Sequence, residues 1–421
     1  MKVLIITYYW PPAGGSGVQR WLKFVKYLQG FNIQPIVYTI SNPRYLTIDD
    51  SLLNEIPENI EVLKHPIWEP TDLLFWKKNL QQNSGISNAS KSSFLSFIRG
   101  NFFIPDPKLF WIKPSVKYLQ KYLNKNDVDV IISTGPPHSM HLIAEKLHQK
   151  NDVKWLADFR DPWSDIYYNK DFKEFSFVKN RNKKLEESVL KKADCVLTVS
   201  NALKKEFSKY ANRVEVVTNG FDDDFLEPTK VLLDEKFTIS YIGLLPKQSN
   251  PENLFRVLQV LCSQHKDFEK ELQLNFIGDI SDEVKTAVFN NKLEENTRFI
   301  NYVNHAKAIE YQRKAQVLLL LIPNVKKCKG ILTGKLFEYL IANRPILAIG
   351  PEDGDLADVI EDTNAGVIVD FDNNDKLSSE ILKLYHQYKK GNLEVDSKNT
   401  NKYHRKELTK KVAFIINSLH S

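Results

Sequence analysis

The sequence predicts an α/β fold of two facing, doubly wound domains with a cleft between them, on three observations. The chain has 421 residues and 42% apolar content, which is enough for two hydrophobic cores. Short apolar runs alternate with amphipathic helical stretches, as in a parallel sheet covered by helices on both faces. This alternation starts a second time after an acidic, polar stretch at 221–236. Because ligands of such sheets bind at the carboxyl ends of the strands, two facing sheets would enclose a binding cleft.

The first domain is expected to span residues 1–222. Its first strand, 2–9, is followed by a helix at 21–31, and a later helix at 141–150 separates two further strands. The other strands of this domain are expected at 33–40, 128–134, 153–159, 193–200 and 214–220.

A stretch from about residue 42 to 118 interrupts the first domain and mixes many lysines with aromatic residues. Basic residues mixed with aromatics can rest on an anionic lipid surface. The alternative is an insertion that buries its aromatic side chains in a small core of its own. The aromatic residues concerned are Trp68, Phe75, Trp76, Phe94, Phe97, Phe102, Phe103, Phe110 and Trp111.

The second domain is expected at 237–400, where a new first strand is followed by a helix at 253–265. The last residues, 401–421, form a helical pattern that we expect to pack back on the first domain. The strands of the second domain are expected at 238–243, 272–278, 297–303, 317–323, 345–350 and 365–370.

Composition narrows the class of partner. The formal net charge of +6 favours an anionic ligand or an acidic membrane surface, and it falls short of a nucleic-acid binder. The cysteines Cys195, Cys262 and Cys328 lack metal-type spacing and cannot all pair, which favours a reduced, cytoplasmic setting. The N-terminus lacks the features of a signal peptide, and no apolar run reaches the roughly 18 residues of a membrane-spanning helix.

A glycine-rich segment, PPAGGSGVQRWL at 11–22, joins the first strand to the first helix. Gly14, Gly15 and Gly17 allow a tight turn and a close approach of backbone N–H groups to a ligand. The helix that follows directs its positive end to the same place. Arg20 stands where a dinucleotide-binding motif needs glycine, so an NAD site is not expected. The alternative is an ordinary turn without a ligand.

A second segment, GILTGK at 330–335, differs from the phosphate-binding loop of ATPases. Only three residues separate its glycines, and Leu336 replaces the required Ser or Thr. Thr333 is expected to cap a helix that begins at Gly334 and Lys335, whose N–H groups and ammonium suit a diphosphate. Glu338, one turn on, can accept hydrogen bonds from a ribose diol. The alternative is a Lys–Glu pair on a solvated helix face.

A third loop, 243–254, follows the first strand of the second domain. Gly243 permits a close approach to a ligand, and Lys247 can reach a phosphate. The alternative is a polar loop with a surface lysine.

Motifs along nearly the whole chain fit one known family. They are YYWPPAGGSGVQR at 8–20, STGPPHSMHLIA at 133–144, WLADFRDPW at 155–163, VSNAL and VTNGFD within 199–222, YIGLLPK at 241–247 and TGKLFEYLIANRPILAI at 333–349. In these stretches the chain resembles the family 4 glycosyltransferases, which have two facing Rossmann-like domains, the GT-B architecture. DFRDPW and GKLFEYL are most similar to a bacterial branch that makes surface polysaccharides. The resemblance implies a retaining transfer of sugar from a nucleotide-diphosphate donor to a glycan or lipid-linked acceptor, with no metal or cofactor.

The resemblance also implies roles for single residues on the donor side. In the family, two glutamates separated by seven residues cross the donor site. The second, which holds the ribose hydroxyls, matches Glu338, whereas Gly330 stands in place of the first. Lys247 matches one member of the basic pair that holds the diphosphate, and Lys335 would supply the charge of the missing arginine. The full expected donor-binding set is Gly14, Gly15, Gly243, Lys247, Tyr302, Val303, Thr333, Gly334, Lys335 and Glu338, with the base near Tyr302 and Val303.

Many family members have a histidine where this chain has Arg160 and Asp161. Asp161 would accept a hydrogen bond from a sugar and Arg160 would stabilise phosphate charge, so these two and Lys335 form the expected catalytic set. Asp158 is a rival for the carboxylate role, and a structural Arg–Asp corner is the alternative.

His138 and His141 follow the strand at 128–134, at the end expected to open toward ligands. His138 is expected to contact the acceptor. The alternative for both histidines is a helix-capping or surface role.

Two other functions remain open at the level of sequence. A sugar-nucleotide 2-epimerase uses the same two-domain architecture. A non-catalytic nucleotide-sugar-binding scaffold in a polysaccharide assembly is consistent with Gly330 in place of the first glutamate. The expected partners are a nucleotide sugar, a glycan or lipid-linked acceptor and an anionic membrane at the inner face of the plasma membrane, with no nucleic acid.

Overall fold

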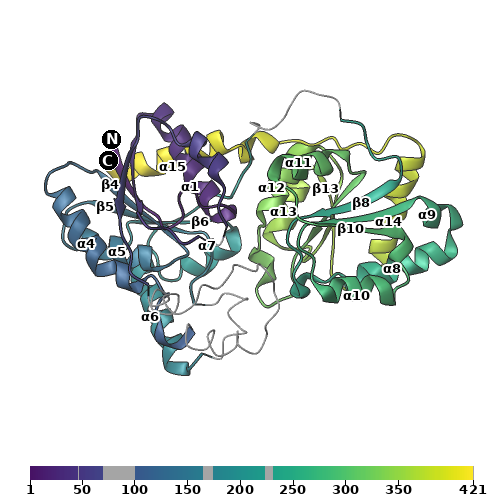
Figure 1. The fold of residues 1–421 in the computed structure, drawn as a ribbon, viewed down its shortest axis with the longest axis horizontal. Coiled ribbons are helices and arrows are strands. Elements are labelled where there is room, and N and C mark those ends of the chain that lie inside the picture. The colour runs from purple at the N-terminus through teal and green to yellow at the C-terminus, as the bar shows by residue number, and fades with distance from the viewer. Residues whose placement is uncertain (46, 70–99, 165–173, 223–230, 421) are drawn as a thin grey trace. The chain divides into compact units, whose positions relative to one another are not determined.

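The chain folds into two compact units, each built around one parallel sheet with helices on both faces (Figure 1). The computed structural model describes residues 1–45, 47–69, 100–164, 174–222 and 231–420. The first unit comprises Met1–Thr218 together with Arg405–Ser421, and the second comprises Asn219–His404. The aromatic residues Phe75, Trp76, Phe94 and Phe97 lie outside the described residues.

The first sheet has the strand order β3-β2-β1-β4-β5-β6-β7, with every pair parallel. Because the order reverses between β1 and β4, the loops after these two strands diverge at the carboxyl edge of the sheet. The strands are β1 Lys2–Ile6, β2 Gln34–Ile40, β3 Glu61–His65, β4 Val130–Gly135, β5 Lys154–Phe159, β6 Cys195–Thr198 and β7 Val214–Val216.

Helices cover both faces of this sheet because its strand residues alternate in direction. Val3 and Ile5 of β1 share a core with α1 and α15, which lie side by side (Figure 1). Leu4 and Ile6 share the opposite core with α4, α5 and α6. The helices of this unit are α1 Ser16–Leu28, α4 Leu109–Leu123, α5 Ser139–His148, α6 Ser176–Lys192, α7 Asn201–Phe207 and α15 Arg405–His420.

The stretch from 42 to 118 is partly built into the first unit, although its composition suggested an interruption. It supplies the edge strand β3 and the helix α4, which packs on α5. Trp111 is buried and stacks on Tyr38 of β2, with ring centroids 5.0 Å apart. Trp68 and Phe110 remain exposed. The aromatic side chains therefore divide between the main core and the surface, and do not form a separate core among the described residues.

The second sheet has the strand order β10-β9-β8-β11-β12-β13 and is also fully parallel. Its order reverses between β8 and β11. The strands are β8 Phe237–Ile242, β9 Leu272–Ile277, β10 Thr297–Ile300, β11 Val317–Leu321, β12 Ile346–Ile349 and β13 Gly366–Val369.

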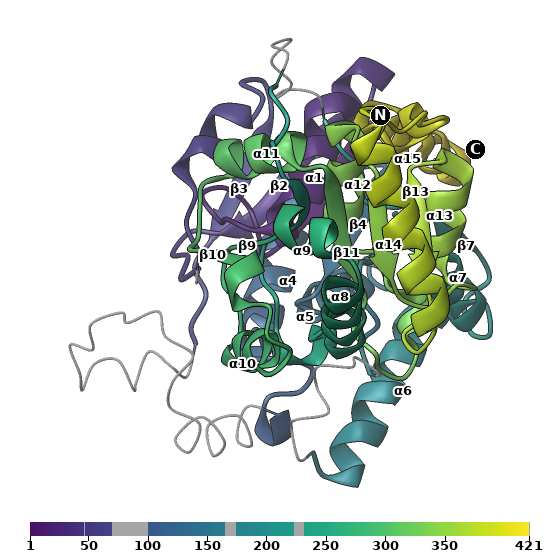
Figure 2. The same ribbon diagram turned by 90° about the vertical axis from the view of Figure 1, so that its right-hand side faces the viewer.

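One face of the second sheet is covered by α8, α9, α10 and α14, of which α8 and α14 lie side by side (Figure 2). The other face is covered by α11, α12 and α13. The helices are α8 Glu252–Gln264, α9 Lys266–Glu271, α10 Asp282–Asn290, α11 His305–Lys314, α12 Gly334–Ala342, α13 Asp355–Thr363 and α14 Asn374–Lys389.

Short 3-10 helices occur in several connections of the described chain. They are η1 Gln29–Phe31, η2 Asp50–Glu55, η4 Lys247–Ser249, η5 Glu294–Asn296, η6 Cys328–Gly330 and η7 Thr400–Tyr403. None of the described helices is both long enough and apolar enough to cross a membrane.

Candidate functional site

The carboxyl edge of the second sheet brings two glycines into contact in the loops after the neighbouring strands β8 and β9. Gly243 follows β8 with φ +117°, and Gly278 follows β9 with φ +126°. Both angles lie in a region that side chains rarely adopt, which explains the choice of glycine. A Cβ atom on Gly278 would lie 2.6 Å from the carbonyl oxygen of Gly243. The backbone after β8 is therefore held close to the neighbouring loop.

The helix α12 begins at this edge, as the sequence predicted. The Thr333 hydroxyl accepts a hydrogen bond from the backbone N–H of Lys335 at 3.4 Å, so Thr333 is the N-cap. The first turn of α12 also directs the positive end of the helix dipole to this place. The tip of α12 is thus suited to an anion.

Lys335 reaches from α12 across to the loop after β8. Its Nζ donates to the Tyr241 hydroxyl at 2.7 Å and to the Leu244 carbonyl at 3.2 Å. The same ammonium lies 4.5 Å from the centroid of the Tyr241 ring. A Cβ atom on Gly243 would lie 2.5 Å from Cε of Lys335, so the path of this side chain requires glycine. Lys335 is therefore a half-buried cation, and the alternative of a Lys–Glu pair on a solvated face is wrong.

Burial lowers the pKa of Lys335 to about 8, and the negative charge of Glu338 opposes this effect. A cation with reduced hydration beside a helix N-terminus interacts strongly with a phosphate oxygen. The charge of Lys335 is therefore available at the tip of α12 below about pH 8.

Glu338 is attached to the neighbouring helix α11. Its Oε2 accepts a hydrogen bond from Nε2 of Gln312 at 3.0 Å, and its Oε1 lies 3.6 Å from Nε2 of His305. These contacts orient the carboxylate while leaving the side chain partly exposed. The sequence did not reveal Gln312, His305 or Tyr241 as neighbours of the site, because contacts between separate elements leave no local pattern.

The other expected donor-side residues lie in the segments that follow β8 and β10. Lys247 opens η4 and is exposed, whereas Tyr302 follows β10 and is 80% exposed. Val303 packs partly against the core under α11 and α12. Within the described part of the chain, neither Lys247 nor Tyr302 makes a hydrogen bond or an ion pair with Lys335. Their expected contacts with a ligand stay predictions.

Gly14 and Gly15 lie in the loop after β1 and differ in their surroundings. The backbone N–H of Gly14 donates to the carbonyl of Thr47 at 2.9 Å, and a Cβ atom here would lie 2.9 Å from Cγ2 of Thr47. Gly15 has φ +86°, and a Cβ atom on it would meet no atom within 4 Å. The helix α1 starts at Ser16, earlier than the predicted residue 21, because Gly15 is its N-cap. Gly17 therefore lies in the first helical turn.

Arg160 joins three parts of the chain at the carboxyl edge of the first sheet. Its guanidinium donates to the carbonyls of Gly17 at 2.6 Å, Gly135 at 3.2 Å and Pro136 at 2.5 Å. These bonds connect the end of β5 with the first turn of α1 and with the end of β4. The geometry fits a positioning role more directly than a contact with phosphate.

Asp161 lies next to Arg160 with a different environment. Burial raises the pKa of Asp161, and the charge of Arg160 opposes that rise. Among residues 1–45, 47–69, 100–164, 174–222 and 231–420, no group donates a hydrogen bond to its carboxylate. Asp161 can therefore accept one from a hydroxyl of a ligand.

Asp158 is excluded as a rival catalytic carboxylate. It is fully buried and accepts hydrogen bonds from Nη2 of Arg20 at 2.9 Å, Nε1 of Trp21 at 2.7 Å and Oγ1 of Thr134 at 2.9 Å. Although burial raises the pKa of Asp158, the charge and hydrogen bonds of Arg20 bring it below its usual range. Arg20 also donates to the carbonyl of Thr218. The residue that departs from the dinucleotide motif is thus a buried structural cation.

His138 and His141 pack on aromatic rings beside Gly135. His138 stacks on Trp163 with centroids 4.8 Å apart, and His141 stacks on Phe159 at 4.3 Å. A Cβ atom on Gly135 would lie 2.6 Å from Nε2 of His141 and 2.9 Å from Nδ1 of His138. Both rings are buried, so the surface alternative is wrong. His138 is the N-cap of α5 but makes no capping bond with its side chain.

Both imidazoles are neutral at physiological pH. Burial lowers the pKa of His138 well below its ordinary value and that of His141 to about 3. His141 Nδ1 lies 2.8 Å from the Ser133 hydroxyl. In the described structure, both ring nitrogens of His138 and Nε2 of His141 have no hydrogen-bond partner. A neutral His138 can accept or donate a hydrogen bond, but its expected contact with an acceptor stays a prediction.

Comparison with protein families finds two matches that follow one another along the chain. Residues 88–225 match the model described as Glycosyltransferase Family 4. Residues 223–403 match the model described as Glycosyl transferases group 1. No protein of curated function matches the chain in sequence.

Solved structures share the whole architecture at low sequence identity. Staphylococcus aureus TarM, in a complex with fondaparinux, α-GlcNAc-glycerol and UDP, has a TM-score of 0.61 at 11% identity, over 99% of both chains. WaaG, a glycosyltransferase of lipopolysaccharide biosynthesis, has a TM-score of 0.56 at 12% identity, over 98% of this chain and 99% of its own. UDP-GlcNAc 2-epimerase from Methanocaldococcus jannaschii has a TM-score of 0.51 at 14% identity, over 99% of this chain and 100% of its own. These likenesses confirm the predicted fold of two Rossmann-like domains.

Proposed function

Because this chain belongs to the glycosyltransferases that join a family 4 domain to a group 1 domain, we propose that it builds a bacterial cell-surface polysaccharide. It transfers a sugar from a nucleotide-diphosphate sugar to a glycan or lipid-linked acceptor, with retention of configuration and without a metal. The observation that carries this proposal is the tip of α12, where Lys335 crosses to the loop after β8. TarM in complex with UDP and WaaG in lipopolysaccharide synthesis support the choice of donor and pathway.

The donor binds at the carboxyl edge of the second sheet. The backbone N–H of Gly334, together with the Lys335 ammonium, holds the diphosphate. Lys247 adds a second positive charge from η4. Glu338, oriented by Gln312, accepts hydrogen bonds from the ribose hydroxyls. Gly243 leaves room for the Lys335 side chain to reach the diphosphate, and the base lies near Tyr302 and Val303.

The transfer separates charge at two places. Positive charge develops on the anomeric carbon, while the leaving diphosphate gains negative charge that the α12 tip and Lys335 stabilise. The acceptor hydroxyl attacks from the side of the leaving group and forms the new glycosidic bond as the bond to the diphosphate breaks. The departing phosphate oxygen takes the acceptor's proton, so the reaction needs no strong protein base.

The first domain supplies contacts to the sugars. Asp161 accepts a hydrogen bond from a sugar hydroxyl, and Arg160 positions the loops that surround it. His138 binds the acceptor. The enzyme acts in the cytoplasm, at the inner face of the plasma membrane.

A screen of nucleotide sugars tests this proposal. The purified chain is heated with UDP-, GDP- and ADP-sugars in turn, since a ligand of the folded state raises the unfolding temperature. We expect one nucleotide class to stabilise the protein and its sugar to be transferred to a glycan or lipid-linked acceptor. Stabilisation by none of the three classes would contradict the proposed donor site.

Two other outcomes separate the alternatives. Epimerised donor in the absence of acceptor would identify a 2-epimerase, whose fold this chain shares. Donor binding without transfer or epimerisation would identify a scaffold, which Gly330 in place of the first family glutamate makes a specific alternative.

A further inference from the structure

One exposed stripe of α4 carries an aromatic residue followed by lysines. Phe110, Lys113, Lys117 and Lys121 are spaced by three, four and four residues, which places them on one side of the helix. The three lysines are exposed, whereas Trp111 on the opposite side is buried against the sheet. The helix therefore has one face in the core and one basic face turned outward.

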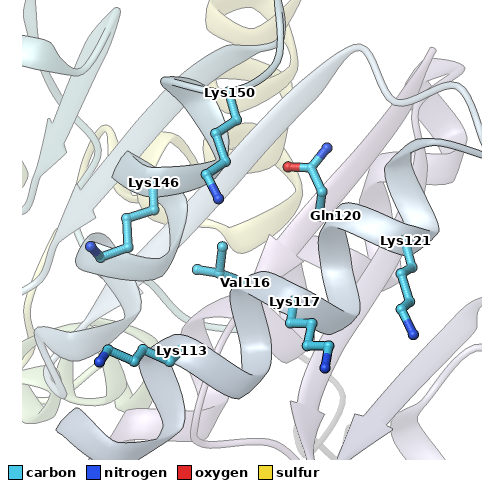
Figure 3. A pocket seen from close by; sticks show the side chains of 7 residues that line it. All are labelled: Lys113, Val116, Lys117, Gln120, Lys121, Lys146 and Lys150. Carbon is cyan, nitrogen blue, oxygen red and sulfur yellow. The ribbon is translucent and has the colours of Figure 1, made fainter.

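A groove between α4 and α5 extends this basic stripe. Lys146 of α5 and Lys150 just beyond it line the groove together with the three lysines of α4, as Figure 3 shows. Its volume is about 440 Å³, and Val116 and Gln120 complete its lining. No carboxylate lines it, and none of the five ammonium groups has an ion-pair or hydrogen-bond partner in the described regions of the chain. Five like charges held together repel one another unless an anion binds them.

Exposed aromatic rings lie at the N-terminal end of the same stripe. The rings of Trp68 and Phe110 meet edge to face with centroids 5.0 Å apart, and they are 49% and 40% exposed. Large rings beside lysines suit the interface of a bilayer, where the ring enters the headgroup layer and the ammonium remains at the phosphates. A soluble anionic polymer would use the lysines but has no need of the exposed rings.

We propose that this basic–aromatic face docks the protein on a bilayer rich in acidic phospholipid. The face is formed by Trp68, Phe110, Lys113, Lys117, Lys121, Lys146 and Lys150. The inference deepens the proposed function, on which it rests, because it names the surface that brings the enzyme to a lipid-linked acceptor. The face includes Lys146 of α5 and Lys150 just beyond it, which lie outside the stretch 42–118 whose composition first suggested a lipid contact.

The test is co-sedimentation of the full chain with vesicles, without substrate or turnover. We expect binding to vesicles of phosphatidylcholine with phosphatidylglycerol, weakening as salt rises, and little binding to pure phosphatidylcholine. The variant K113E/K117E/K121E should bind at least ~30-fold more weakly, on the scale of three lysine contacts with an anionic surface. Trp68→Ser with Phe110→Ser should also weaken binding, and this loss should persist in high salt.

A matched control distinguishes the effect of this face from the effect of net charge alone. The variant K270E/K390E/K410E changes the charge by the same amount at exposed lysines of α9 and α15 and just after α14. It should bind the anionic vesicles as the unmodified chain does, and circular dichroism should show that all variants are folded. Equal losses in both triple variants would overturn the proposal, as would an absence of binding to anionic vesicles.

Two further results bear on the partner and on the proposed function. Soluble polyphosphate that binds as tightly as vesicles of equal phosphate content, without sensitivity to Trp68 and Phe110, would overturn the bilayer in favour of an anionic polymer. Because the test requires no transfer, a chain that transfers sugar but ignores vesicles would refute only the docking face. A chain that binds vesicles but transfers nothing would refute only the enzymatic proposal.

Discussion

Lys335 is the residue on which the proposed chemistry depends most directly. Its ammonium is oriented by the Tyr241 hydroxyl and the Leu244 carbonyl rather than by solvent. A charge held in place before the reaction stabilises a leaving group without reorganisation at the moment of transfer.

Lys335→Ala should lower kcat for sugar transfer at least ~100-fold, because one charge at the leaving diphosphate is lost. Steady-state kinetics with the donor found by the nucleotide screen measures this loss. Lys390→Ala, an exposed lysine after α14, is the control and should keep full activity. A folded Lys335→Ala variant with unchanged kcat would remove Lys335 from the mechanism.

The pH dependence of kcat/KM should report the titration of the Lys335 ammonium. Because burial lowers the pKa of Lys335 to about 8, kcat/KM for the donor should fall as pH rises through that value and the ammonium loses its proton. In Lys335→Arg the side chain stays charged at all accessible pH, so this decline should disappear even if the rate is lower. The same alkaline decline in the arginine variant would assign the titration to another group.

Replacement by asparagine should affect two neighbouring carboxylates differently, lowering stability at Asp158 and turnover at Asp161. Asp158→Asn leaves the buried Arg20 without its partner and should lower the free energy of unfolding by about 3 kcal/mol or more. Asp161→Asn, where no described group donates to the carboxylate, should leave stability nearly unchanged and reduce turnover. Urea unfolding of the first unit and transfer kinetics measure the two effects. A stable Asp158→Asn variant would show that its hydrogen bonds contribute little.

At the scale of secondary-structure elements, the loop after β8 and the start of α12 are held together by contacts between them. Gly243 is compatible with Lys335 only because it lacks a side chain and adopts φ +117°. The N-cap Thr333 fixes where α12 begins, and Tyr339 of the same helix accepts a hydrogen bond from the backbone N–H of Ile242 at 3.1 Å. The helix α12 and the strand β8 are thus joined by two hydrogen bonds, one from Lys335 to Tyr241 and one from Ile242 to Tyr339.

Gly243→Ala should strain this loop and displace Lys335. The backbone conformation alone should cost about 1–3 kcal/mol of stability, and donor affinity should fall with it. Thermal unfolding and donor titration give the two values. Gly30→Ala is the control, because a Cβ atom there would meet nothing within 4 Å. Normal donor affinity in Gly243→Ala would show that the close approach to Lys335 is not needed.

Over the whole molecule, the last helix belongs to the unit that contains the first strand. The residues Val412 and Ile416 of α15 are buried in the core that Val3 and Ile5 of β1 share with α1. The last segment of the first unit therefore follows the whole second unit in the sequence and is synthesised after it.

Ile416→Ala should destabilise the first unit by about 2–5 kcal/mol, since it opens a cavity in a fully buried position. Because a chain of two units need not unfold in one step, hydrogen exchange is the suitable measurement. Protection should fall in β1 and β4 and stay constant in β8 and β9. Phe414→Ala, at a residue that is 71% exposed, should change neither unit. A uniform loss over both sheets would contradict this division.

Local pattern predicted most of the regular structure. Apolar runs located twelve of the described strands, and the N-cap at Thr333 was read from residue types alone. The strand β3 was missed because its sequence, EVLKH, mixes charged with apolar residues at the edge of the sheet. The start of α1 was placed too late because Gly17 was assigned to the loop.

By itself, the amino-acid sequence determined the class of fold, the restart of the strand pattern and the start of α12 at its N-cap Thr333, whereas anion binding at that tip stays a prediction. These properties follow from periodicity and capping within a few residues of chain. Only the tertiary structure decided that Lys335 meets Tyr241 across 94 residues, and that Arg20 neutralises Asp158 across 138. It also decided that His138 and His141 are buried and neutral. Such contacts depend on strand order and burial, which bring together residues that no local pattern connects.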